Sequence, residues 1–225
     1  MEGKLIVIES GTDSSGKETQ SKLLCKRLVE NHKVIRVEYP NYDSSSSALI
    51  KMYLKGEFGE KAEDVNCYAA STFYAVDRFA SFQKEWKEMY ENGWIIVADR
   101  YTTSNMVHQG AKISDRGEKV EYLEWLRDLE HGKFGLPVPD LVVLLDMSPQ
   151  KSKELLRKRK TYKSGEERDI HEDDFAYLIN SYNNACWLAE RYGWKTVNCL
   201  QDGKLRSVED IHSEIHDIVI KEIID

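Results

Sequence analysis

The sequence has no long hydrophobic run, few prolines and no paired cysteines. Its 225 residues contain 4 Pro and 13 Gly, which excludes fibrous and low-complexity classes. The first apolar stretch, residues 5–8, is too short for a signal peptide or a membrane span, so we expect no membrane association and a cytoplasmic location. The 4 cysteines are far apart and form no Cys-x-x-Cys pair, which favours reduced thiols over a disulfide framework or a zinc site.

Basic residues are fewer than acidic ones. The chain has 32 Lys and Arg against 39 Asp and Glu, a net charge of -7, which argues against a surface built for nucleic acid or anionic lipid. The 41% of hydrophobic residues is ample for a core, and the length fits one compact domain spanning 1–225.

Short apolar segments alternate with longer amphipathic ones. This order is typical of a parallel sheet with crossover helices, so the fold class is α/β. Segments rich in Val and Ile predict five parallel strands at 5–8, 34–38, 94–98, 141–146 and 195–198. Helical patterns occur at about 16–31, 48–55, 62–92, 118–131, 151–160, 172–192 and 208–224.

The helix expected at 62–92 carries an aromatic and a basic residue on one face. A stripe at helical spacing is expected to be buried, and it comprises Val65, Ala69, Thr72, Val76 and Phe79. Tyr74 and Arg78 lie nearly opposite Val76 and point into the same space. Either they form a recognition pair, or the ring is exposed beside an arginine that extends to solvent.

The strongest local motif follows the first strand and opens a helix. Gly11, Thr12, Asp13, Ser14, Ser15, Gly16 and Lys17 have the spacing of a phosphate-binding P-loop, and the segment continues with Glu18 and Thr19. Glycines let the backbone N–H groups surround phosphate, the helix start adds partial positive charge, and Lys17 adds a full one. The motif predicts ATP binding by 11–19.

Two acidic residues are candidate ligands for Mg²⁺. Glu18 occupies the position where Ser or Thr usually ligates the metal, and a carboxylate can also do so. Its charge would also lie near the triphosphate, so either the metal moves towards Glu18 or the side chain turns away. Asp99 ends the strand at 94–98, and strand ends of such sheets face the ligand crevice.

Several motifs, in this order, resemble those of thymidylate kinases. They are the run from Thr12 to Gln20, the segment 73–78 containing Tyr74 and Arg78, the triplet Asp99-Arg100-Tyr101 with Ser104 and Gln109-Gly110, and the strand 138–146. The resemblance covers nearly the whole chain. It implies a three-layer P-loop fold with a short lid, usually dimeric, that transfers the γ-phosphate of ATP to dTMP with Mg²⁺ as cofactor.

The resemblance also implies roles for individual residues. Asp13 would hold the sugar 3′-hydroxyl, and Tyr74 would stack on thymine. Arg78 and Arg100 would bind the monophosphate. Tyr101 would pack against the deoxyribose and oppose a 2′-hydroxyl, while the remaining polar residues, Ser104 and Gln109, would lie near the base.

A basic segment follows the fourth strand. Residues 151–163 contain seven basic side chains and one acidic one, which favours a lid over ATP at about 157–171 rather than nucleic-acid binding. The P-loop contains no arginine to neutralise transition-state charge, so the lid is expected to supply the catalytic cation beside Lys17 and Arg100. The candidates are Arg159, Lys163 and Arg168.

Four positions differ from the family pattern. Ser10 replaces an acid, with Glu9 one residue earlier, and Glu18 replaces a hydroxyl. Tyr42 stands where close relatives have an arginine, and His108 stands where an aromatic residue is common. These departures leave two alternatives open: a kinase of another deoxynucleotide or deoxynucleoside, or a catalytically weak nucleotide-binding regulator.

Overall fold

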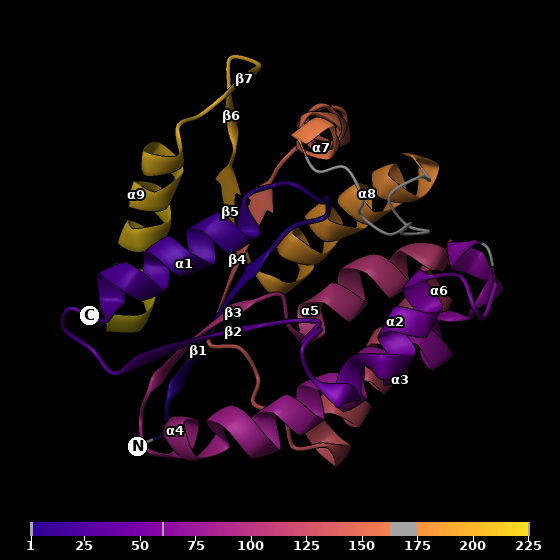
Figure 1. Cartoon of the computed structure of the whole chain (residues 1–225), viewed down its shortest axis with the longest axis horizontal. Coiled ribbons are helices and arrows are strands. Elements are labelled where there is room, and N and C mark those ends of the chain that lie inside the picture. Colours follow the sequence, from indigo (N-terminus) through magenta and orange to yellow (C-terminus); the bar gives the residue numbers. More distant parts are fainter. Residues whose placement is uncertain (1, 60, 163–174, 225) are drawn as a thin grey trace.

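A parallel five-stranded sheet forms the centre of the molecule (Figure 1). The computed structural model describes residues 2–59, 61–162 and 175–224. The strand order is β2-β3-β1-β4-β5. The strands are β1 (Lys4–Glu9), β2 (Val34–Glu38), β3 (Ile95–Asp99), β4 (Leu141–Asp146) and β5 (Lys195–Asn198). The predicted strands and α/β class are therefore confirmed, and the P-loop follows the central strand.

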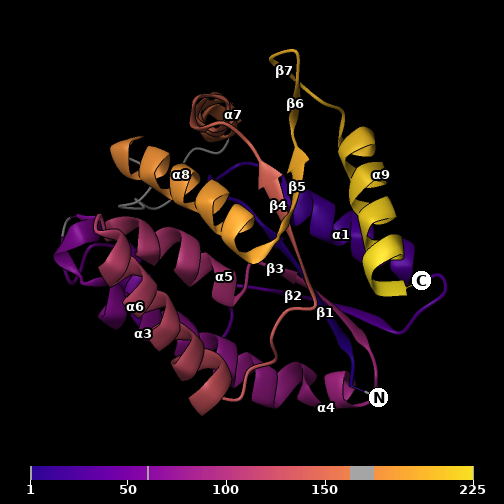
Figure 2. The same cartoon turned by 180° about the vertical axis from the view of Figure 1, so that it is seen from behind.

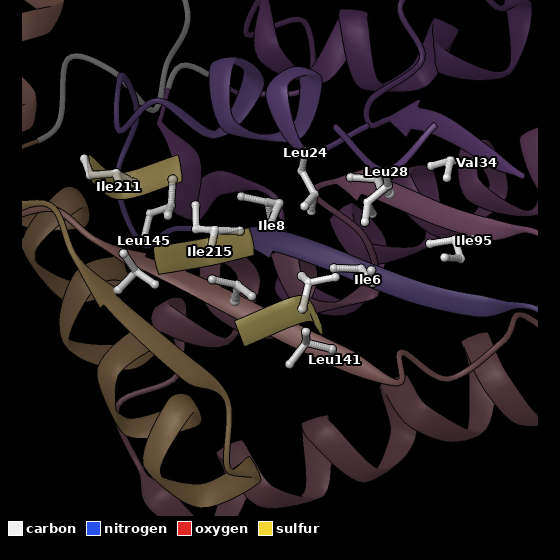
Figure 3. Close-up of a cluster of buried hydrophobic side chains, with 14 of the residues drawn as sticks. Ile6, Ile8, Leu24, Leu28, Val34, Ile95, Leu141, Leu145, Ile211 and Ile215 are labelled. Carbon is white, nitrogen blue, oxygen red and sulfur yellow. The ribbon is translucent and has the colours of Figure 1, made fainter. Parts of the chain in front are cut away.

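Two helices cover one face of the sheet, α1 (Lys17–Leu28) and α9 (Val208–Val219). Alternate residues of a strand point to opposite faces, so Ile6 and Ile8 of β1 point to the same side. Figure 3 shows them among Leu24 of α1 and Ile211 and Ile215 of α9, all five buried. Burying such a side chain contributes about 1.5–3 kcal/mol, so this layer holds the strand before the P-loop firmly.

The longer helices cover the other face, as Figure 2 shows from behind. They are α3 (Cys67–Ser81), α6 (Arg116–Arg127) and α8 (Phe175–Tyr192). Here Leu5 and Val7 of β1 share a buried cluster with Phe82 and Trp86. Both faces of the sheet are therefore covered, which confirms the three-layer fold.

The remaining elements are short apart from one helix at the carboxyl edge of the sheet, α7 (Pro149–Tyr162). The other α-helices are α2 (Ala48–Leu54), α4 (Lys87–Glu91) and α5 (Thr102–Ser104). The 3-10 and π turns are η1 (Ser45–Ser47), η2 (Ala62–Asp64), η3 (Phe82–Trp86), η4 (Asn105–Gln109), η5 (Gly110–Lys112), η6 (Asp128–Lys133) and η7 (Ile220–Ile224). A hairpin is formed by β6 (Leu200–Gln201) and β7 (Lys204–Leu205).

The helix predicted over 62–92 is wrong in its start and in its buried face, whereas consecutive helical turns do continue to Glu91. The helix α3 begins only after Asn66, whose side chain accepts a hydrogen bond from the Ala69 N–H at 2.8 Å. Val76 and Phe79 are 45% and 37% exposed, whereas Arg78 is 1% exposed. Small and polar residues form the inner face, because polar partners inside the fold satisfy them, and hydrophobic spacing cannot reveal such partners.

Two further elements were not predicted. Residues 102–112 form consecutive helical turns, and the hairpin at 200–205 extends beyond β5. The turns depend on a tertiary contact, because Asn184 of α8 donates hydrogen bonds to the carbonyls of Met106 and Val107 at 2.9 and 2.7 Å. A segment held by a distant side chain has little local signal of its own.

No helix in the described ranges is long and apolar enough to cross a membrane. All four cysteines are free thiols, as their spacing predicted.

A buried ion pair connects α3 to the turn that follows α6. The guanidinium of Arg78 donates to both carboxylate oxygens of Glu130, at 2.6 and 2.7 Å. Asn105 donates a further hydrogen bond to Glu130 at 3.1 Å. Because both charged side chains are almost fully buried, removal of either one leaves the other charge without compensation.

We therefore expect Arg78→Met and Glu130→Gln each to lower the free energy of unfolding by about 3–5 kcal/mol. The double variant Arg78→Met/Glu130→Gln should lose less than the sum of the two, because no unpaired charge remains. Urea denaturation of the four proteins measures this. Additive losses would contradict the coupling.

Candidate active site

The P-loop has the conformation that its glycines predict. Gly16, directly before α1, has a φ of 91°, a left-handed conformation that favours glycine. Gly11 lies against α8: a Cβ at this position would be 2.7 Å from the Cα of Tyr182. The loop is thereby held between the start of α1 and the side of α8, with its backbone curved as phosphate binding requires.

Lys17 lies inside this loop, with only 7% of its surface exposed. Its Nζ donates to the Thr12 carbonyl at 3.1 Å and to Ser15 Oγ at 3.3 Å. Burial, together with repulsion from Arg100, lowers the pKa of Lys17 to about 8. The loop therefore contains a partly compensated positive charge that a phosphate group would stabilise.

A cavity of about 140 Å³ opens beside the P-loop. It contains five residues expected to bind substrate, Asp13, Tyr74, Arg100, Ser104 and Gln109. Its other lining residues are Pro40, Tyr42, Leu54, Asn105, His108, Tyr177 and Leu178. Aromatic, cationic and amide groups thus converge on one small space, as in sites that bind a small polar ring compound.

Arg100 connects the cavity to the P-loop. Its backbone φ is 65°, which is unusual for a residue with a side chain and is typical of functional sites. The guanidinium donates to Asp13 Oδ1 at 2.8 Å and approaches Glu9 at 3.7 Å. It also lies 2.8 Å from His108 Nε2, which must accept this hydrogen bond because arginine cannot.

Of the five buried side-chain polar atoms that lack a hydrogen-bond partner within the described ranges, two belong to the site. One is Ser14 Oγ in the P-loop, and the other is Gln109 Oε1 in the cavity wall. Buried polar groups are nearly always paired, so an unpaired atom in each half of the site is consistent with a ligand for each half.

Two residues that were predicted to bind substrate, Arg78 and Tyr101, do not line this cavity. Arg78 has both arms of its guanidinium on Glu130 and is not available to a phosphate. Tyr101 is fully buried among Tyr39 and Trp86, and its hydroxyl donates to the Pro137 carbonyl at 3.1 Å. It packs in the core and forms no wall against a sugar.

The two expected metal ligands are not close together. The Glu18 side chain is 60% exposed and forms an ion pair with Lys22, so it points away from the P-loop and does not fit a metal ligand. Asp99 stays at the carboxyl end of β3, where its Oδ2 accepts from Arg36 at 2.9 Å and lies 3.5 Å from Ser21 Oγ. Its position between α1 and the P-loop fits a ligand for Mg²⁺.

Lys163 and Arg168 lie outside the described residues, as does the side chain of Arg159 near the end of α7. The connection of α7 to the site is described: Ser152 Oγ donates to the Asp13 carbonyl at 2.6 Å.

Sequence reasoning missed the role of Glu9 and part of the cavity lining. Glu9 is fully buried and accepts hydrogen bonds from Thr103 and Ser104 at 2.7 and 2.6 Å. Its only signal was an acid at the end of the first strand. Tyr177 and Leu178 line the cavity from α8, where no motif marks them.

A P-loop at the end of the central strand, beside a small cavity with an arginine between them, defines a P-loop kinase of small phosphorylated compounds. The family comparison is more specific. Residues 8–215 match the family described as thymidylate kinase, and the chain belongs to that family.

Bacteria, archaea and fungi all contain proteins of similar sequence. The thymidylate kinase of Mycobacterium tuberculosis is 32% identical over 172 residues, which cover 76% of this chain and 78% of that protein. The probable thymidylate kinase of Pyrococcus horikoshii is 30% identical over 227 residues, covering 100% and 99%. The solved thymidylate kinase of Candida albicans has the same fold, with a TM-score of 0.70, 19% identity and coverage of 98% and 92%.

The lowered pKa of Lys17 predicts how the free energy of unfolding depends on pH. Between pH 8 and the usual lysine value near 10.5, the unfolded chain binds more protons here than the folded one, so stability rises with pH in that window. We expect Lys17→Met to be more stable than wild type at pH 7, by up to about 3 kcal/mol, with a gap that narrows by pH 9.5.

Urea denaturation without nucleotide at several pH values measures this gap. Lys26→Met, at an exposed position of α1, is the matched control and should show no such trend. If Lys17→Met is less stable at pH 7 and the difference does not vary with pH, the Lys17 charge is not destabilising.

Proposed function

We propose that this protein transfers the γ-phosphate of ATP to the phosphate of dTMP and releases ADP and dTDP. The observation that carries this proposal is the contact of 2.8 Å between Arg100 and Asp13, which joins the P-loop to the cavity. In the reaction an oxygen of the dTMP phosphate forms a bond to the γ-phosphorus, and the bond from that phosphorus to the bridging oxygen of ADP breaks. Both substrates must therefore meet at Arg100.

The donor half is the P-loop, residues 11–19. Its N–H groups and Lys17 would hold the β- and γ-phosphates, and the orphaned Ser14 Oγ would gain a partner. Asp99 would hold Mg²⁺, which supplies charge neutralisation to the phosphates when it is bound. Within the lid, about 157–171, the candidates for additional positive charge stay Arg159, Lys163 and Arg168.

The acceptor half is the cavity. Tyr74 offers a ring face to the base, and Gln109 offers an amide whose Oε1 has no partner within the described ranges. Ser104 lies in the same wall. Arg100 would bind the monophosphate, and Asp13 would accept the sugar hydroxyl. We assign the phosphate to Arg100 and not to Arg78, because Arg78 is buried with its guanidinium on Glu130.

An ADP-release assay with ATP and each nucleoside monophosphate tests this function. We expect turnover with dTMP, and a loss of about 10² or more in kcat for Lys17→Met. Tyr74→Ala should weaken dTMP by about 1–3 kcal/mol, the range for one stacked base. Glu18→Gln, which changes an exposed carboxylate of the same helix, should retain the rate.

If the protein phosphorylates another deoxynucleotide but not dTMP, the substrate is that deoxynucleotide. No turnover with any acceptor, in a folded protein that binds ATP, would leave a nucleotide-binding regulator as the function.

We further propose that the enzyme is a cytoplasmic homodimer that forms one domain, with no nucleic-acid or membrane partner. Exposed apolar side chains of α3 support the dimer. Tyr68, Val76 and Phe79 are 42%, 45% and 37% exposed on one side of this helix. Two aromatic rings outside α3 adjoin this surface. The ring centroids of Phe79 and Phe134 are 5.2 Å apart, and those of Tyr68 and Trp125 are 4.7 Å apart. Contiguous apolar surface of this kind is typical of protein interfaces.

We expect Val76→Asp/Phe79→Asp to convert the dimer to a monomer, because each subunit would place two carboxylates in an apolar interface. Analytical ultracentrifugation over a range of concentrations measures the change. Val29→Asp is the matched control, since Val29 is 56% exposed at the end of α1. A wild-type monomer, or a dimer in the double variant, would contradict the proposed interface.

A further inference from the structure

A second, polar pocket lies between α6 and α8. Its volume is about 260 Å³, and its lining residues are Ala111, Ile113, Ser114, Arg116, Lys119, Asn180, Asn183, Asn184 and Trp187. At 100° per residue, the α8 members of this set lie on the side of the helix opposite Ser181, Tyr182 and Ala185, which contact Gly11 of the P-loop. The pocket is therefore separate from the proposed kinase site.

Three cations surround the ring of Trp187 in this pocket. Arg116, Lys119 and Arg191 lie 5.9, 5.7 and 5.6 Å from the ring centroid. Cation–π contacts attract each cation to the ring, but they do not cancel its charge. The ring thus gathers positive groups at one place in a chain whose net charge is -7.

These three cations have no ion-pair partner among the residues that the structure describes, although Lys4, Arg78 and other cations of the chain have one. The nearby acid Asp115 caps α6 by accepting from the Glu118 N–H at 2.9 Å. Arg116 and Lys119 are three residues apart on one helix, where like charges destabilise each other.

The pKa of Lys119 reflects this local excess of positive charge. Burial lowers its pKa, and repulsion from Arg116 lowers it further, with no acid raising it. A bound anion would reverse the second effect. The pocket wall also carries the neutral amides of Asn180 and Asn183 and the hydroxyl of Ser114, groups that can donate hydrogen bonds to oxygen.

We propose that this pocket binds a polyphosphate-class oxyanion, held by Arg116 and Lys119 and completed by the asparagine amides. Several donors around two cations suit a ligand with many acceptor oxygens rather than a single carboxylate. The volume of about 260 Å³ exceeds that of one phosphate group and accommodates a diphosphate.

The pocket is connected to the acceptor cavity through Asn184. Its Oδ1 accepts from Lys119 at 3.1 Å, and its Nδ2 donates to the carbonyls of Met106 and Val107. These carbonyls belong to η4, the turn that carries His108 and Gln109 of the cavity. An anion that draws Lys119 away from Asn184 therefore acts on the turn that forms the acceptor wall.

Isothermal titration with inorganic pyrophosphate tests the site. The experiment uses the Lys17→Met protein, in which anion binding at the P-loop is weakened. We expect one-to-one binding that weakens with added salt, and a loss of about tenfold or more when Arg116→Gln and Lys119→Gln are added. Adding Lys26→Gln and Lys84→Gln instead removes the same charge at exposed positions and should leave the affinity nearly unchanged.

Two results would overturn the proposal. One is the absence of pyrophosphate binding to the Lys17→Met protein at millimolar concentration, and the other is equal weakening by both pairs of substitutions. Amide hydrogen exchange provides a second readout, because pyrophosphate should change protection at residues 105–109 in the Lys17→Met protein and not after loss of Arg116 and Lys119. Neither readout requires kinase activity, so a failure here is distinct from a failure of the proposed function.

Discussion

The contact between Arg100 and Asp13 is the interaction on which the site depends. Arg100 follows β3 and Asp13 belongs to the P-loop after β1, and these strands are neighbours in the sheet. Parallel register brings both strand ends to the same edge, and the left-handed backbone at Arg100 places its guanidinium between the loop and the cavity. Glu9 and His108 hold the same group from two other sides, so its position is fixed before any substrate arrives.

Several features of this site lower the stability of the folded protein. Lys17 is charged and buried, Arg100 has an unfavourable backbone conformation, and Ser14 and Gln109 contain buried polar atoms without a partner within the described ranges. The two apolar layers around the sheet offset these costs, since β1 is buried on both sides directly before the P-loop. A bound phosphate would offset the buried charge of Lys17 and give Ser14 Oγ an acceptor, so ligand binding would also stabilise the fold.

Helix α8 connects features that are far apart in the chain. One side approaches the P-loop closely enough that Gly11 cannot carry a side chain. Tyr177 and Leu178 line the acceptor cavity, and Trp187 gathers the three cations of the second pocket. Asn184 holds the turn that carries His108 and Gln109. A change in the position of this helix would therefore affect the P-loop, the cavity beside it and the second pocket together.

The sequence by itself determined the strands, the sheet class, the P-loop and the identity of the family. These depend on local patterns: runs of Val and Ile, glycines at set spacing, and motifs in a fixed order. It also indicated Asp13, Tyr74, Arg100, Ser104 and Gln109, which the fold brings to one cavity. The tertiary structure decided which face of α3 is buried, because Glu130, fifty-two residues after Arg78, compensates a charge that periodicity assigns to solvent. For the same reason only the structure could place Tyr101 in the core and Glu9 close to Arg100: the partners that decide these positions are distant in sequence and adjacent in space. Glu18 turns instead to Lys22, four residues along the same helix.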